Sequence, residues 1–147
     1  MGNWSGFMVC TFFGHREVYE DIENNLKSII VDLIVKENVT EFYVGNQGKF
    51  DYLVRKTLAE LSEVYNIKYT TVLAYLPQEY EPIEFVSNTI LPNGIESVPK
   101  RFARDWRNRW MLKKSKFVVT YVNKIIGGAA KFKELAEKQN KIVININ

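Results

Sequence analysis

The chain has 147 residues, 46% hydrophobic and 25% charged, which is typical of one globular domain and excludes a disordered, collagen-like or disulfide-scaffold protein. Twenty Lys and Arg against 17 Asp and Glu leave a net charge of +3, which is small for a protein that wraps nucleic acid. Cys10 is the single cysteine, so no intrachain disulfide or CxxC metal pair is expected. No apolar run reaches the roughly 18 residues of a membrane helix, and the N-terminus lacks a signal-peptide pattern. We therefore expect one cytoplasmic domain over residues 1–147, with no metal or cofactor.

Short apolar runs alternate with amphipathic segments along the first half of the chain. Residues 7–13 form an uncharged apolar run that predicts a buried strand, and apolar residues spaced by three and four predict a helix over 17–36. The pattern repeats with a strand at 41–44 and a helix from 50 to about 65. A third strand is predicted at 69–75.

The second half opens with a proline-rich segment. Residues 78–99 contain three of the four prolines, which predicts a loop that forms a flexible lid and carries one brief strand at 89–91. The remaining predicted elements are a helix at 101–114, a strand at 117–122, a helix at 127–139 and a strand at 142–146.

This alternation predicts an α/β fold, a Rossmann-like three-layer sandwich with a mostly parallel five-stranded sheet. Open sheets of this kind bind ligands beyond the carboxyl ends of their strands, at the point where the strand order switches. The loops that follow the strands are therefore where we look for a site.

The loops after the first two strands carry candidate ligand-binding residues. Glycine permits a tight turn, and the main-chain N–H groups at a helix start can bind an anion. A carboxylate beside them can accept a hydrogen bond from a ribose hydroxyl. Ordinary polar turns are the alternative for both loops. The candidates are Gly14, His15, Arg16, Gly45, Asn46, Gly48 and Asp51.

A cationic, aromatic helix and a Gly-Gly helix start supply further candidates. Adjacent glycines expose N–H donors, and an arginine offers a planar fork that suits phosphate or carboxylate. For Trp106 and Trp110 we favour core or dimer contacts. The ligand-binding candidates in this part are Arg109, Gly127, Gly128 and Ala129.

Taken in this order, these residues resemble the SLOG superfamily, the Rossmann-like proteins related to LOG phosphoribohydrolases and to YpsA-like proteins. The resemblance implies binding of a nucleotide or a nucleotide-derived ligand, such as an ADP-ribose-like signal. LOG enzymes cleave the N-glycosidic bond of nucleoside monophosphates with an Arg in M-x-x-R-K-x-x-M and a Glu in P-G-G-x-G-T-x-x-E. Arg107 and Glu134 fall on these two catalytic positions.

The sequence departs from the LOG pattern beside both positions. Asn108 replaces the Lys, Ala130 and Lys131 replace the Gly-Thr, and the loop at 123–126 is longer. Loss of Gly-Thr removes a permissive backbone position and a hydroxyl donor. The sequence therefore favours a sensor or sequestering protein that binds its ligand without turnover. The alternative is a nucleoside 5'-monophosphate phosphoribohydrolase-like hydrolase, so whether the protein is an enzyme is left open.

The expected partner is a nucleotide-type small molecule. Nucleic-acid binding through residues 100–114 is a third possibility, but a basic helix with two tryptophans is more often a solvated face with a buried side. We therefore expect neither a nucleic acid nor a membrane as partner. We expect a homo-oligomer that pairs through this aromatic helix.

Overall fold

The computed structural model describes residues 8–76 and 83–146. In chain order its elements are β1 (Val9–Gly14), α1 (Glu23–Lys36), β2 (Glu41–Val44), α2 (Gly48–Ser62), β3 (Lys68–Val72), β4 (Thr89–Ile90), the 3-10 helix η1 (Ile95–Ser97), α3 (Lys100–Lys114), β5 (Phe117–Tyr121), α4 (Gly128–Lys138) and β6 (Ile142–Asn145).

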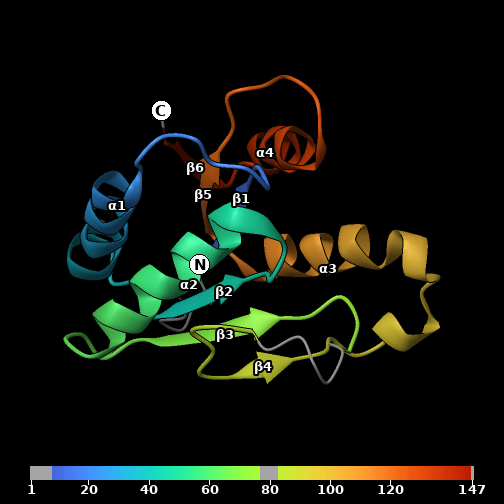
Figure 1. The fold of residues 1–147 in the computed structure, drawn as a ribbon, viewed down its shortest axis with the longest axis horizontal. Coiled ribbons are helices and arrows are strands. Elements are labelled where there is room, and N and C mark those ends of the chain that lie inside the picture. Colours follow the sequence, from blue (N-terminus) through green and yellow to red (C-terminus); the bar gives the residue numbers. More distant parts are fainter. Residues whose placement is uncertain (1–7, 77–82, 147) are drawn as a thin grey trace.

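The strands described form one sheet in the order β4-β3-β2-β1-β5-β6, and every neighbouring pair is parallel (Figure 1). This confirms the Rossmann-like α/β fold, but the prediction of five strands is wrong, because the sheet has six. The additional strand, β4, pairs Thr71 with Thr89 and Val72 with Ile90 at the sheet edge. Two residues are too few to show a periodic pattern. The sequence therefore predicted only a brief strand within a loop, and the expected sheet did not include it.

Helices cover both faces of the sheet. Cys10 and Phe12 of β1 pack with Leu26 of α1 and the buried side chains of α2. The next residue of β1, Phe13, points to the other face and packs with Met111 of α3 and Phe132 of α4. Successive side chains of a strand point to opposite faces, so a strand buried on both sides appears as an unbroken apolar run.

Several predicted boundaries differ from those observed. Helix α1 begins at Glu23 and not at residue 17, because the Asp21 carboxylate accepts the Glu23 N–H (3.2 Å) and the apolar periodicity starts only at Ile22. Strand β3 ends at Val72, three residues before its predicted end. Part of the proposed lid, residues 78–82, lies outside the described residues, as does residue 7.

The strand order places a switch point beside β1. From β1 the chain builds outward through β2, β3 and β4, then returns to β5 on the opposite side of β1 and continues to β6. The loops that leave β1 and β5 therefore diverge at the carboxyl edge, which is where sheets of this type bind ligands. Within residues 8–76 and 83–146, no helix combines the length and apolar composition needed to cross a membrane.

Substitution of Leu26 by Ala should lower the free energy of unfolding by about 2–5 kcal/mol, because this α1 side chain is fully buried and its loss leaves a cavity. Val35→Ala on the exposed side of the same helix is the control and should change it by less than about 0.5 kcal/mol. Urea unfolding measures both. Equal effects of the two variants would contradict the packing of α1 described above.

Candidate functional site

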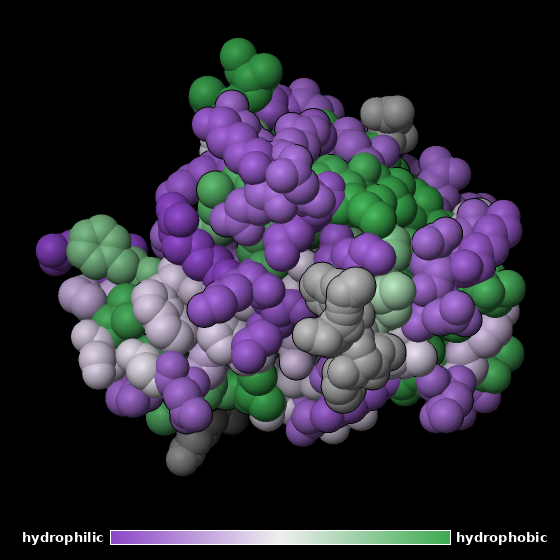
Figure 2. Space-filling model, turned by 180° about the vertical axis from the view of Figure 1, so that it is seen from behind, coloured by the Kyte–Doolittle hydropathy of each residue, from purple (hydrophilic) through white to green (hydrophobic). Residues whose placement is uncertain are grey.

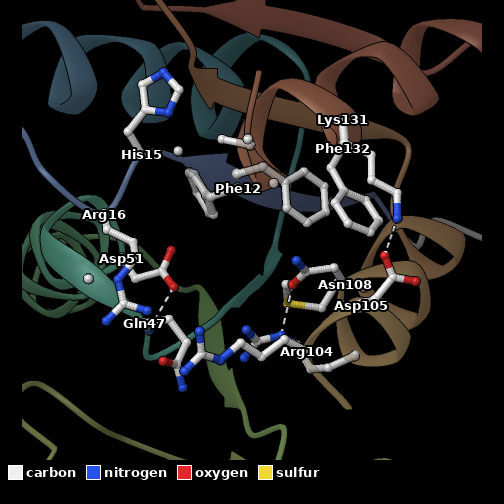
Figure 3. A pocket seen from close by; sticks show the side chains of 18 of the residues that line it. Phe12, His15, Arg16, Gln47, Asp51, Arg104, Asp105, Asn108, Lys131 and Phe132 are labelled. Carbon is white, nitrogen blue, oxygen red and sulfur yellow. Dashed lines mark hydrogen bonds and ion pairs between the residues drawn. The ribbon is translucent and has the colours of Figure 1, made fainter. Parts of the chain in front are cut away.

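A cleft of about 920 Å³ opens at the carboxyl edge of the sheet, at the switch point. Its walls come from the loop after β1, the start of α2, one side of α3 and the loop that leads into α4. Figure 3 shows Arg16, Asp51 and Gln47 on one side and Asp105, Lys131 and Phe132 on the other. Four segments that are far apart in the sequence thus meet around one space.

The cleft concentrates positive charge. The basic residues that line it are Arg16, Arg101, Arg104, Arg107, Lys124 and Lys131, and the acidic ones are Glu17, Asp51 and Asp105. This excess of three equals the net charge of the entire chain, +3. The charges of the remaining residues therefore sum to zero, and the positive potential is focused at the cleft.

Five of the lining cations are exposed: Lys131, which pairs with Asp105, and the other four, Arg16, Arg101, Arg104 and Lys124. Within residues 8–76 and 83–146, none of the four makes an ion pair. Arg104 Nε instead donates a hydrogen bond of 2.7 Å to the Tyr75 hydroxyl. Their charges are therefore available to an anion in solution.

Lys131 differs from these four because Asp105 binds it. The Lys131 ammonium lies 2.5 Å from Asp105 Oδ1 (Figure 3). Arg109 Nε lies 2.7 Å from Oδ2 of the same carboxylate. Burial acts to raise the pKa of Asp105, but hydrogen bonds and attraction from Lys131 and Arg109 outweigh it and hold the pKa below its usual range. This carboxylate ties α3 to α4 across one wall.

The floor of the cleft holds a buried arginine, Arg107, which is 2% exposed. Its Nη1 donates to the Val72 carbonyl at the end of β3 (2.7 Å), and its Nε donates to Asn108 Oδ1 (2.8 Å). Among the described residues, Nη2 makes no hydrogen bond, although the side chain lines the cleft. Burial lowers the pKa of Arg107 below its usual value, and the attraction of Asp51 offsets this effect only in part.

Asp51 supplies a negative charge beside two buried guanidinium groups. Its Oδ2 accepts the Gln47 N–H (3.0 Å) in the first turn of α2. Burial raises the pKa of Asp51, and Arg107, the Gln47 N–H, Arg55 and Arg16 act in the opposite direction. Arg55 donates to the carbonyls of Gly45 and Glu84, both at 3.0 Å. One carboxyl group between two buried arginines leaves this cluster with an excess of positive charge.

The predicted glycine loops serve two different purposes. A Cβ on Gly45 would lie 2.7 Å from Asp51 Oδ2 and 2.9 Å from Arg107 Nη1, so glycine leaves room for the buried cluster. A Cβ on Gly127 or Gly128 would meet no atom within 4 Å, and Gly127 has φ +108°. The backbone of these two glycines therefore faces open space at the start of α4, where N–H groups suit an anion.

His15 connects the loop after β1 to the loop after β5. Its Nε2 accepts the Asn123 N–H (3.1 Å), and its ring packs edge-on against Tyr121. Burial lowers the pKa of His15, and the charge of Lys124 lowers it further. The neutral ring is therefore the form that holds the Asn123 backbone.

The structure brings most of the predicted site residues together. Those that line the cleft are Gly14, His15, Arg16, Gly48, Asp51, Arg107, Gly127, Gly128 and Ala129. Four others do not line it. Gly45 and Asn46 lie behind the Gln47 wall, Arg109 pairs with Asp105 on the exposed side of α3, and Glu134 is exposed on α4.

The sequence did not single out Arg101 and Lys124, and Arg104 was named only as part of a longer stretch. Arg104 precedes Arg107 by three residues and Arg101 precedes Arg104 by three, so each successive pair is adjacent on the helix surface, and all three line the cleft. That spacing was a usable signal. Lys124 carried none, because it lies in an irregular loop whose path the sequence does not reveal. Within the described residues, no group of three or more His, Cys, Asp or Glu could hold a metal ion.

Comparison with known proteins gives structural relatives and no sequence family. No family model matches the chain, and no curated protein matches it. The chain resembles the X-ray structure of DNA processing protein A (DprA) from Streptococcus pneumoniae, with a TM-score of 0.70 and 16% identity over 95% of this chain and 50% of that one. It also resembles the Helicobacter pylori DNA processing protein A, whose structure describes a single-stranded DNA binding mode, with a TM-score of 0.59 and 12% identity over 96% of this chain and 66% of that one. These likenesses establish the fold, and the chain spans about half to two thirds of each relative.

These relatives overturn the predicted function. The expectation of a nucleotide-ligand sensor or sequestering protein, with a hydrolase as alternative, is wrong, as is the expectation that nucleic acid is not a partner. The physical reason lies in the distribution of charge. A net charge of +3 indicates weak attraction of nucleic acid when it is spread over the whole surface, but here the excess of basic residues is gathered in one cleft.

His15 should titrate below the ordinary histidine pKa of about 6.5, because burial and Lys124 favour the neutral ring. The unfolded chain then binds a proton at a higher pH than the folded chain does. The contribution of His15 to the free energy of unfolding is therefore complete above about pH 6.5. It is lost as the pH falls through the pKa of His15 in the folded protein. His15 is the single histidine, so one imidazole resonance in an NMR titration reports it. A midpoint at or above 6.5 would contradict the Asn123 contact.

Asp51→Asn should lower the free energy of unfolding by about 3 kcal/mol, because it removes the countercharge of buried guanidinium groups while keeping the side-chain size. Glu60→Gln on the exposed side of the same helix is the control and should leave stability within about 0.5 kcal/mol. Denaturant unfolding compares the two. An unchanged stability in Asp51→Asn would mean that Arg107 does not depend on this charge.

Proposed function

We propose that the cleft binds single-stranded DNA. The observation that carries the proposal is the set of exposed cations, Arg16, Arg101, Arg104 and Lys124, around a cleft at the switch point of the sheet. The fold similarity to a DNA processing protein with a described single-stranded DNA binding mode supports the same function. Cations that neutralise phosphates supply most of the non-specific affinity for nucleic acid.

The positions of these cations suit a chain of phosphates better than a single one. They come from three separate segments, the loop after β1, the start of α3 and the loop after β5. Arg107 on the floor adds a buried guanidinium with an unbonded Nη2, which suits one phosphate or one base edge held deeper in the cleft. A strand that crosses the cleft can meet several of these groups in turn.

Single-stranded DNA is favoured over a duplex by the shape and chemistry of the site. A volume of about 920 Å³ lies in the range of small-molecule pockets, so individual nucleotides can enter but a double helix cannot. Aromatic and basic side chains also lie together at the start of α3, next to the lining residues Arg101 and Arg104, where Lys100 lies over the Tyr75 ring (5.3 Å) and Arg101 over the Phe102 ring (4.7 Å). Such surfaces bind unpaired strands by stacking and charge.

Some narrower assignments stay predictions of the sequence. One is the assignment of the chain to the SLOG superfamily near the LOG and YpsA-like proteins. The others are that the protein forms a homo-oligomer and that it binds DNA in the cytoplasm. The Arg107 and Glu134 positions of the LOG pattern also stay predictions. In the proposed function Arg107 is a binding residue, and Glu134, which does not line the cleft, has no role.

Removal of two exposed lining cations should weaken DNA binding and reduce its salt dependence. For Arg16→Ala combined with Arg101→Ala, we expect at least about tenfold weaker binding of a fluorescein-labelled dT20 oligonucleotide at low salt. The slope of log K against log salt should become shallower by about 0.7 for each phosphate that the variant no longer neutralises. Fluorescence anisotropy over a salt series measures both quantities.

Lys27→Ala combined with Lys36→Ala removes the same charge from α1, away from the cleft, and is the matched control. It should leave the affinity within about twofold at moderate salt, where exposed charges beyond a Debye length are screened. Equal losses in the two double variants would indicate only general attraction of DNA by a basic protein. The absence of any binding by the parent protein would reject the proposed function.

A further inference from the structure

The loop between β5 and α4 exposes two adjacent isoleucines beside the cleft. Ile125 is 97% exposed and Ile126 is 77% exposed, more than almost any other large hydrophobic side chain in the described part of the chain. In Figure 1 this segment, in orange, extends beyond the helices at the top of the molecule. In Figure 2, seen from behind, a hydrophobic protrusion stands at the same end. A pair of isoleucines in water is unfavourable unless something covers it.

This apolar tip, Ile125 and Ile126, adjoins the wall of the cleft. Ile126 lines the cleft together with its neighbours Lys124 and Gly127. The tip therefore stands between an exposed cation on one side and the open backbone at the start of α4 on the other. A ligand in the cleft would therefore lie directly beside Ile126, and Ile125 is the preceding residue of the same loop.

Both ends of the loop are held by hydrogen bonds. At its start, the Asn145 side chain accepts the Val122 N–H (3.0 Å) and donates to the Val122 carbonyl (3.1 Å), while His15 accepts the Asn123 N–H. At its end, the Gly127 carbonyl accepts the Lys131 N–H (3.1 Å). The tip is thus presented from a fixed base, and little ordering is needed when a ligand meets it.

We propose that the apolar tip contacts the bases of an unpaired strand whose phosphates lie on the cations of the cleft. The inference rests on the proposed function and adds the part of the ligand that this loop recognises. Charge complementarity favours DNA as the occupant, since Lys124 and the cleft cations place an anionic backbone next to the tip. In a single strand the bases lie beside that backbone, with their apolar faces exposed.

Isoleucine suits this contact because it can pack against any base face. Apolar side chains, isoleucine among them, insert between base steps in other nucleic-acid complexes. Such a contact reads no base edge, so it gives no preference for one sequence. In a duplex the same contact must first unstack a base step, which costs free energy, whereas an unpaired base presents its face without that cost, so the contact favours a single strand.

The test compares a normal strand with one that has no bases. The probes are fluorescein-labelled dT20 and an abasic oligonucleotide of the same length and charge, each titrated with the parent protein and with Ile125→Ser combined with Ile126→Ser. The control is Val35→Ser combined with Val64→Ser, which removes two exposed apolar side chains away from the cleft. Circular dichroism checks that all the proteins are folded.

The double isoleucine variant should bind dT20 about 5- to 30-fold more weakly than the parent, equivalent to about 1–2 kcal/mol. It should bind the abasic strand as tightly as the parent does, with an unchanged salt slope, and the control should match the parent on both probes. An equal loss on both probes, or no loss on dT20, would overturn the role of the tip while leaving DNA binding intact; the second result points to a protein or another surface as its occupant. No binding of either probe by the parent would overturn the proposed function and this inference together.

Discussion

The buried guanidinium of Arg107 is the interaction on which the site depends. It fixes α3 to the end of β3 through the Val72 carbonyl, and it lies beside Asp51 at the start of α2. Because a buried charge without partners is costly, these groups must stay together for the protein to be stable. Gly45 is part of the same constraint, since any larger residue would collide with both charged groups. The floor of the cleft and the orientation of α3 thus follow from one packing arrangement.

The other walls of the cleft are positioned by contacts that extend from this floor. Arg101, Arg104 and Arg107 follow one another at intervals of three along α3 and all line the cleft, and Asp105 ties that helix to α4 through Lys131. His15 in turn joins the loops after β1 and β5. The result is a fixed frame with exposed cations at its rim, which is the arrangement that the proposed binding of a strand through its phosphates requires.

The sequence predicted the architecture well and the function poorly, for separable reasons. Apolar periodicity is a local signal, so the long helices and buried strands were found. The brief strand predicted at 89–91 is β4, but the sequence did not show that it joins the sheet, and the start of α1 at Glu23 was missed. Most of the predicted site residues line the cleft because they follow strands of a parallel sheet. The distribution of charge in space is not a local signal, and Lys124 joins the site only through the path of its loop. The net charge of +3 therefore hid the feature that best supports DNA binding.

The most direct test of the account is NMR mapping of the backbone amides of the protein during titration with an unlabelled dT oligonucleotide. Binding in the cleft predicts that the largest shift changes fall in the loops at residues 14–17, 47–51 and 124–129 and at the start of α3, with little change in α1. Shift changes concentrated on α1 or on the β6 edge of the sheet, with the cleft residues unaffected, would contradict it.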